Sequence, residues 1–142
     1  MKTITICGKD YNIDCNALTY KNYRTKFNTD IFSDIRILQS FLTKQVLSTE
    51  YLKKENPDID DATIMSSLST LMLDDMGLFI EAATRMAYIM ILAVDKTIPE
   101  YDKWLESIPS IKTNDEWIVE VTEFAVDCFC WQWIIRKNKK NK

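Results

Sequence analysis

The chain has 142 residues, of which 46% are apolar and 27% charged, a length and balance that fit one domain with its own hydrophobic core. Its formal net charge of -3 argues against broad nucleic-acid binding, which usually needs a basic surface. Only 2 glycines and 3 prolines interrupt a sequence rich in good helix formers, so we expect a mostly α protein.

Residues 1–15 predict a β-hairpin. Residues 3–7 and 10–14 each alternate, and Gly8 between them can adopt the dihedral angles of a tight turn. The alternation places Ile4, Ile6, Tyr11 and Ile13 on one face. Because two strands alone are only marginally stable, we expect this face to pack on helices or to pair with another chain.

Residues 19–136 predict a bundle of about five helices. Thr19 is the expected N-cap of a short helix that ends near Phe27. The second helix runs from about Ile31 to Lys54. Its apolar residues recur at three- and four-residue steps and form one face: Ile31, Ile35, Leu38, Leu42 and Val46.

The segment 60–95 predicts either two helices or one kinked helix, with a break near Asp74, Asp75 and Gly77. Its first apolar face consists of Ile64, Leu68, Leu71 and Met72. From Leu78 onward only a narrow stripe is polar: Glu81, Thr84, Arg85 and Tyr88. So thin a stripe is typical of the central helix of a bundle, and Glu81 and Arg85, four residues apart, are expected to pair on it.

Two further helices are expected. Pro99 opens a short one that carries Tyr101, Trp104 and Leu105. Thr113 to Glu116 has the pattern of a capping box before a final helix that reaches about Arg136. One heptad-like seam follows this helix: Trp117, Val121, Phe124, Cys128, Trp131 and Ile135. The basic residues 137–142 are expected to be a solvated, disordered tail of the single domain 1–142.

The expected compartment is the cytoplasm. The alternating start lacks the apolar core of a signal peptide, and the stretch Leu78–Val94 is short for a membrane span and contains two charges. Four cysteines, Cys7, Cys15, Cys128 and Cys130, are therefore expected to be reduced, buried or half-buried thiols. Their spacing lacks the Cys-x2-Cys pattern of a structural zinc site.

The residue types that most enzymes need are missing. The sequence has no histidine, which removes the commonest general base and metal ligand. Glycine is too scarce for a phosphate-binding loop, and the acidic run at 58–61 lacks the glycine and closing glutamate of a calcium loop. We therefore expect neither enzymatic activity nor a cofactor.

The aromatic residues of the last helix are the candidate site for a partner. Phe129, Trp131 and Trp133 crowd one stretch, and one helix in a chain of this size has limited room to bury them all. Either all three lie in the core or some remain outside as an interface, since exposed large aromatics mark partner surfaces. Trp117 and Phe124 of the same helix are included as candidates.

The sequence also resembles a known family in three segments: residues 4–11 (ITICGKDY), residues 15–19 (CNALT) and residues 27–32 (FNTDIF). Together with Ile108-Pro109-Ser110 before a last helix bearing Trp117 and Phe124, they are similar to tail assembly chaperones of long-tailed phages and prophages of Gram-positive bacteria. The resemblance implies a protein that binds the tape-measure protein, keeps that helical chain soluble and helps tail-tube subunits assemble around it.

Other features follow from the same resemblance. Many such chaperones have a second, longer form made by ribosomal frameshifting, and Arg136-Lys137-Asn138 and Lys139-Lys140-Asn141 could each be encoded over an A-rich slippery heptamer. Self-association through the hairpin edge or the last helix is an open possibility, whereas nucleic-acid and membrane binding are not expected. The alternatives are a small phage regulatory or adaptor protein and a minor virion structural protein.

Overall fold

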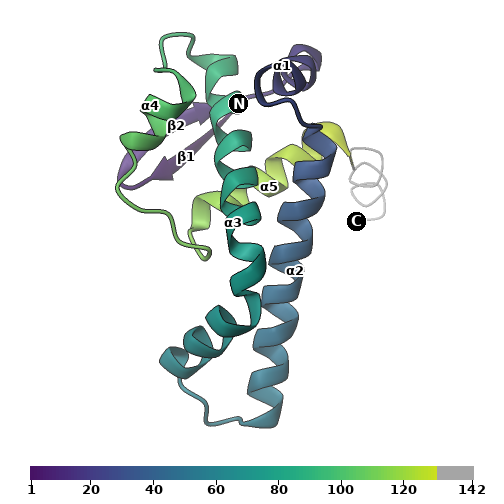
Figure 1. The fold of residues 1–142 in the computed structure, drawn as a ribbon, viewed down its shortest axis with the longest axis vertical. Coiled ribbons are helices and arrows are strands. Elements are labelled where there is room, and N and C mark those ends of the chain that lie inside the picture. The colour runs from purple at the N-terminus through teal and green to yellow at the C-terminus, as the bar shows by residue number, and fades with distance from the viewer. Residues whose placement is uncertain (131–142) are drawn as a thin grey trace, which may run out of the picture.

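The computed structural model describes residues 1–130 and confirms a mostly α fold with an N-terminal hairpin packed on helices (Figure 1). Two strands come first, β1 (Lys2–Ile6) and β2 (Lys9–Ile13). Five helices follow: α1 (Ala17–Phe27), α2 (Ile31–Glu55), α3 (Asp61–Val94), α4 (Tyr101–Glu106) and α5 (Glu116–Phe129). The longest, α3, packs against α1, α2, α5 and β2, so it is the central helix that its thin polar stripe predicted.

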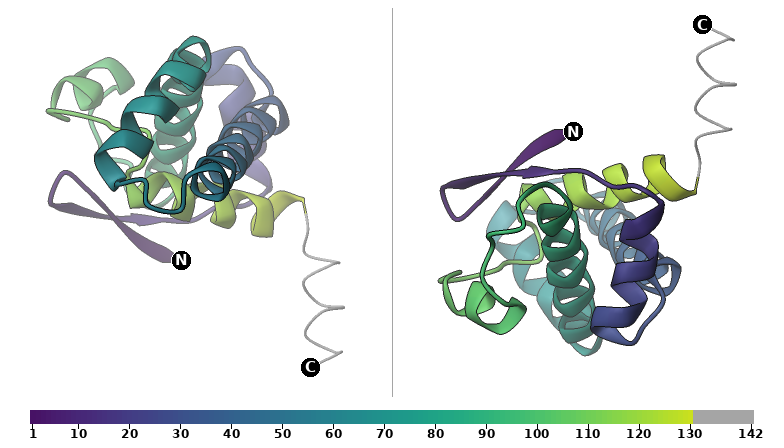
Figure 2. Two further views of the ribbon diagram at one scale, coloured as in Figure 1. Left: turned by 90° about the horizontal axis from the view of Figure 1, so that it is seen from below. Right: turned by 90° about the horizontal axis from the view of Figure 1, so that it is seen from above.

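The hairpin is antiparallel and pairs Ile6 with Lys9 across a two-residue turn. Cys7 and Gly8 form the turn with φ values of 50° and 81°, the left-handed conformations of a type I′ turn. Ile4, Ile6 and Ile13 are buried on the predicted face, and Tyr11 is half-buried. That face packs on α3 and α5, and Figure 2 shows the sheet lying along the α5 side of the helices.

The N-cap of helix α1 lies three residues before the predicted one, Thr19. The cap is Asn16, whose side chain accepts hydrogen bonds from the backbone N–H groups of Leu18 and Thr19. In return, the Thr19 hydroxyl accepts from the Asn16 N–H at 3.0 Å. Thr19 is therefore the third helical residue of a capping box rather than the cap itself, because Asn is as good a cap and stands where the chain is still extended.

Helix α3 is continuous over 34 residues, so the alternative of two separate helices is wrong. Its first turns lie at an angle to the rest, as Figure 1 shows, which is the predicted kinked form. Only part of the polar stripe reaches solvent, because Thr84 and Tyr88 are buried beneath α4 and the loop before it. The Tyr88 hydroxyl donates to the Pro99 carbonyl at 2.8 Å, and the Thr84 and Tyr101 hydroxyls are 2.8 Å apart.

Helix α5 lacks the predicted capping box. Its N-cap is Asp115, and no side chain caps its first turn. The Asp115 carboxylate instead accepts a hydrogen bond from the Lys112 N–H at 2.9 Å, which closes the preceding turn. The predicted end of the helix near Arg136 and the predicted tail 137–142 lie outside the described residues.

A buried ion pair joins α2 to α3. The guanidinium of Arg85 donates to both carboxylate oxygens of Asp34, from Nε at 2.9 Å and from Nη2 at 3.0 Å. The Tyr23 hydroxyl of α1 donates to the same carboxylate. The predicted contact of Arg85 with Glu81 also forms, at 3.8 Å. Because Asp34 is 1% exposed, the pair of Arg85 with Asp34 is far better shielded from water than the pair with Glu81.

The expectation that all four cysteines are reduced, buried or half-buried thiols is wrong. Cys15 and Cys128 form a disulfide between the start of α1 and the last turn of α5. Cys7 and Cys130 are free thiols but are exposed. The local spacing of the cysteines could not predict this bond, because Cys15 and Cys128 are 113 residues apart and meet only in the folded chain.

Candidate protein-binding surface

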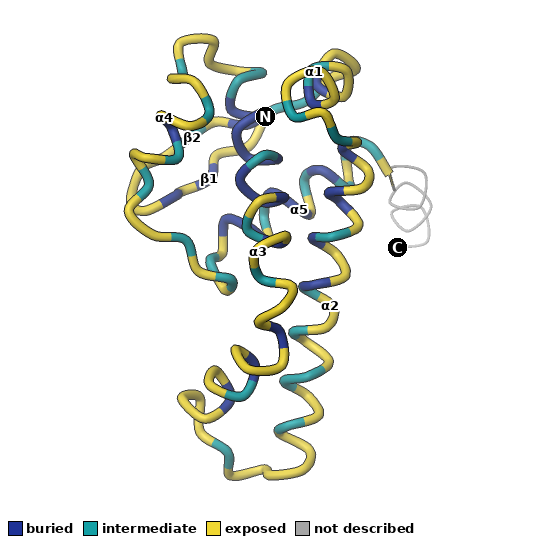
Figure 3. Tube along the Cα trace, in the orientation of Figure 1, coloured by how far each residue is buried: buried dark blue, intermediate teal, exposed yellow. Residues whose placement is uncertain are grey.

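The outer parts of α2 and α3 project beyond the core as a helical hairpin (Figure 3). We call residues 43–73 the arm. Three of its side chains are buried between the helices, Ile64, Leu68 and Met72, and these hold α3 against α2. Figure 3 shows that most of the remaining arm is exposed.

The arm leaves large apolar side chains in solvent. On α2, Val46, Leu47 and Tyr51 are 56%, 59% and 62% exposed. On α3, Leu71 and Leu73 are 57% and 66% exposed. Val46 and Leu71 lie on the apolar faces predicted for their helices, and both are exposed. Single exposed apolar residues are ordinary, but several on one projecting element are typical of a partner-binding surface.

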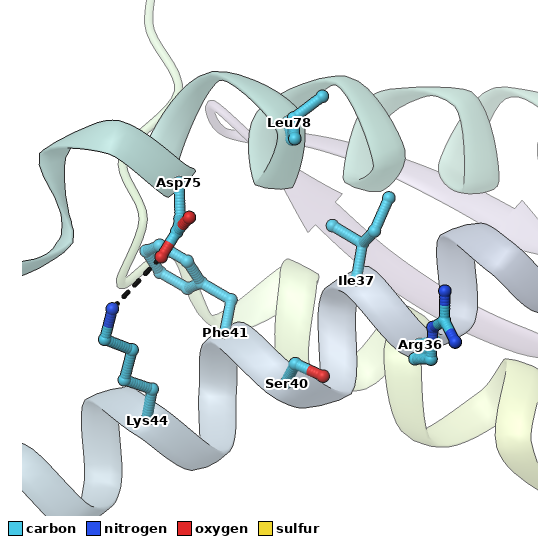
Figure 4. A pocket seen from close by; sticks show the side chains of 7 residues that line it. All are labelled: Arg36, Ile37, Ser40, Phe41, Lys44, Asp75 and Leu78. Carbon is cyan, nitrogen blue, oxygen red and sulfur yellow. Dashed lines mark hydrogen bonds and ion pairs between the residues drawn. The ribbon is translucent and has the colours of Figure 1, made fainter.

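A hollow of about 230 Å³ lies between α2 and α3 at the base of the arm (Figure 4). Ile37 and Phe41 of α2 and Leu78 of α3 supply its apolar walls, and the Phe41 ring stacks on that of Phe79 at 4.0 Å. At one side the ammonium group of Lys44 and the carboxylate of Asp75 are 3.1 Å apart. An apolar floor with charges at its edge suits one inserted side chain from a protein partner.

A second, larger hollow of about 500 Å³ lies on the other side of α2, where α5 and the loop before it approach. Leu42, Val46 and Leu47 line it from α2, and Val119 lines it from α5. Glu123 stands at its edge. The exposed Val46 and Leu47 thus extend a concave apolar surface rather than standing alone, which is the shape that an amphipathic helix fills.

The structure describes three of the aromatic residues predicted to bind a partner, Trp117, Phe124 and Phe129. Trp117 is 4% exposed and belongs to the core. Phe124 and Phe129 are half-buried against that core, and the Phe129 ring meets the ring of Phe32 edge-on at 6.4 Å. Trp131 and Trp133 lie outside the described residues, so whether they bind a partner stays a prediction.

The described residues offer little for chemistry other than binding. Among residues 1–130 no group of three or more cysteine, aspartate or glutamate side chains is placed to hold a metal ion. The most shielded polar cluster, formed by Tyr23, Asp34 and Arg85, is internally satisfied. Burial, with the Asp34 carboxylate beside it, raises the pKa of the Tyr23 hydroxyl far above its ordinary value, so this tyrosine stays neutral.

Helix α3 is also long and apolar enough, by length and composition, to cross a membrane. In its most apolar window, however, 56% of the residues are buried inside the fold, and the core helix of a soluble protein passes the same test.

The chain matches no protein-family model, no curated protein and no solved structure.

Proposed function

We propose that this protein is a non-catalytic chaperone that binds a long helical client, namely the tape-measure protein of a phage tail, and assists assembly of the tail tube. The observation that carries the proposal is the group of exposed apolar side chains on the arm, centred on Val46, Leu47 and Tyr51. The resemblance of residues 4–11, 15–19 and 27–32 to tail assembly chaperones suggests the identity of the client.

The geometry of α2 supports a helical client. Leu47 and Tyr51 are four residues apart and therefore share one face of α2. Val46 adds the adjoining side and leads into the apolar hollow next to Val119. An amphipathic helix laid along this face would bury its own apolar residues at the same spacing.

The composition supports binding rather than catalysis. The absence of histidine leaves no ordinary general base near neutral pH. A net charge of -3 keeps the chain itself away from electrical neutrality, which favours its solubility.

The proposal is tested by co-expression with a fragment of a tape-measure protein. We expect the wild-type chain to raise the soluble fraction of the fragment and to co-purify with it. If neither happens, the proposed function is wrong. A mobility shift of nucleic acid at low salt would favour the regulatory alternative, and incorporation into purified virions would favour a minor structural protein.

A pair of variants tests the surface. Leu47→Ser combined with Tyr51→Ser removes two exposed contacts, and we expect binding of the fragment to weaken at least about 30-fold, the loss that removal of one interface hot spot causes. The matched control is Leu18→Ser on α1, where the leucine is 55% exposed but lies outside the arm. Circular dichroism checks that both variants are folded. Equal binding of the fragment by the folded double variant and the folded control would exclude the arm as the binding surface.

A further inference from the structure

The last turn of α5 is tied to the beginning of the helical region by a covalent bond. Cys128 lies in this turn, and Cys15 lies between the end of β2 and the Asn16 cap of α1. The Cα atoms of the two cysteines are 6.8 Å apart. Both residues are half-buried, so a small thiol can approach the bond from solvent.

Few other contacts hold this turn in place. The buried residues of α5 are Trp117, Ile118, Val121, Thr122 and Ala125. From residue 126 to residue 130 no residue is buried, and Val126 and Phe129 are half-buried. Within the described part of the chain, no side-chain hydrogen bond or ion pair links residues 126–130 to another element. The disulfide is therefore the strongest single connection of the turn to the rest of the protein.

The aromatic contact at this end is weak by comparison. The Phe129 ring meets the edge of Phe32, which is itself 42% exposed and stands 5.8 Å from the ring of Tyr20. An edge-on aromatic pair adds only modestly to the stabilisation that its buried area provides. A helix end held by contacts of that size opens locally much more often than the core does.

We propose that the Cys15–Cys128 disulfide is a redox-sensitive latch that locks residues 126–130 of α5 onto the start of α1. In the oxidised protein the turn is closed and Phe129 stays against Phe32. In the reduced protein α5 remains docked through Trp117 to Ala125, while its last turn opens and its ring contact is loosened. The latch concerns this end of α5 alone and does not depend on which client the protein binds.

The chemistry of opening is ordinary thiol–disulfide exchange. A thiolate of a small dithiol attacks one sulfur of the bond, and its second thiol releases the protein from the mixed disulfide. Two electrons and two protons pass to the protein, giving the thiols of Cys15 and Cys128, and the dithiol closes to its cyclic disulfide. Oxidised glutathione drives the reverse reaction and is itself reduced to two thiols.

Hydrogen exchange on the wild-type chain tests the latch without any mutation. The protein is oxidised with oxidised glutathione, or reduced with dithiothreitol, and exchange is followed by mass spectrometry. We expect reduction to speed exchange of the backbone amides in residues 126–130 by about 10-fold or more. Exchange in residues 116–122 should change less than about twofold, since that part of α5 keeps its buried contacts.

Thiol variants supply the matched controls. Cys15→Ser should show the reduced pattern in the absence of reductant, whereas Cys7→Ser with Cys130→Ser should respond to reduction as the wild type does. Three results would overturn the latch. The first is alkylation of all four cysteines in the oxidised protein, which would mean that no disulfide forms. The second is equal hydrogen exchange of residues 126–130 in the oxidised and reduced states. The third is an equal acceleration of hydrogen exchange along the whole chain, which would mean that the bond stabilises the entire fold rather than this turn.

Discussion

Removing the carboxylate of Asp34 is expected to destabilise this protein strongly. In Asp34→Ala the guanidinium of Arg85 loses both of its short contacts, at 2.9 and 3.0 Å, and the Tyr23 hydroxyl loses its acceptor. The Tyr23 hydroxyl is then left without a partner, and the guanidinium keeps only its longer contact with the exposed Glu81, at 3.8 Å. The cost comes from this unpaired state rather than from the loss of the pair as such.

The magnitude follows from the burial of the two partners. Breaking a buried ion pair by removing one member costs about 3–5 kcal/mol. The Asp34 side chain is 1% exposed but that of Arg85 is 20% exposed, so water can partly solvate the abandoned guanidinium. We therefore expect a loss near the lower end, about 3 kcal/mol, from a total stability that for a domain is about 5–15 kcal/mol.

Urea unfolding followed by circular dichroism measures this loss as a fall in the midpoint at an unchanged slope. The control is Lys44→Ala, which removes an ion pair of similar length, 3.1 Å, whose side chains are 49% and 54% exposed. Exposed pairs contribute about 0–1 kcal/mol, so the control should unfold close to the wild type. Asp34→Ala with Arg85→Met should recover part of the loss, because no unpaired charge then remains.

Two outcomes would refute this reasoning. The first is a loss of unfolding free energy below about 1 kcal/mol in Asp34→Ala. An exposed ion pair contributes as much, so the buried network would then add nothing special to the stability of the fold. If the double variant were less stable than Asp34→Ala, the loss would come from packing or from the ion pair itself rather than from an abandoned charge.

Four smaller effects are expected. Burial and the Asp34 carboxylate raise the pKa of Tyr23 above its ordinary 10.0. The neutral hydroxyl therefore contributes its full stabilisation below pH 10 and progressively less above it. In urea unfolding between about pH 9 and 11, the stability of the wild type should fall more steeply than that of Tyr23→Phe. Asn16→Ala removes a cap that binds two N–H groups and should cost about 1 kcal/mol by the same assay. Gly8→Ala places a side chain at φ 81° and should lower the melting temperature through a loss of about 1 kcal/mol. Burial raises the pKa of the Cys130 thiol, so iodoacetamide should label it slowly at pH 7 and faster as pH rises, as read by peptide mass spectrometry.

The sequence predicted those parts of the fold that depend on near neighbours. Alternation in residues 3–14 predicted the hairpin and its buried isoleucines, because a strand repeats every two residues. The spacing of Ile31, Ile35 and Leu38 predicted α2, since these residues share one face of a helix. The thin polar stripe after Leu78 predicted that α3 would be central, although it did not predict that Thr84 and Tyr88 would be covered.

Only the tertiary structure decided which residues far apart in sequence would meet. Asp34 and Arg85 are 51 positions apart and Cys15 and Cys128 are 113 apart, distances over which local pattern carries no information. The arm was missed for the same reason. Val46 and Leu71 continue the apolar spacing of their helices, but they stay exposed because those helices extend past the elements that could cover them. Periodicity says which face of a helix is apolar, and only the neighbouring elements determine whether that face is buried or free to bind a partner.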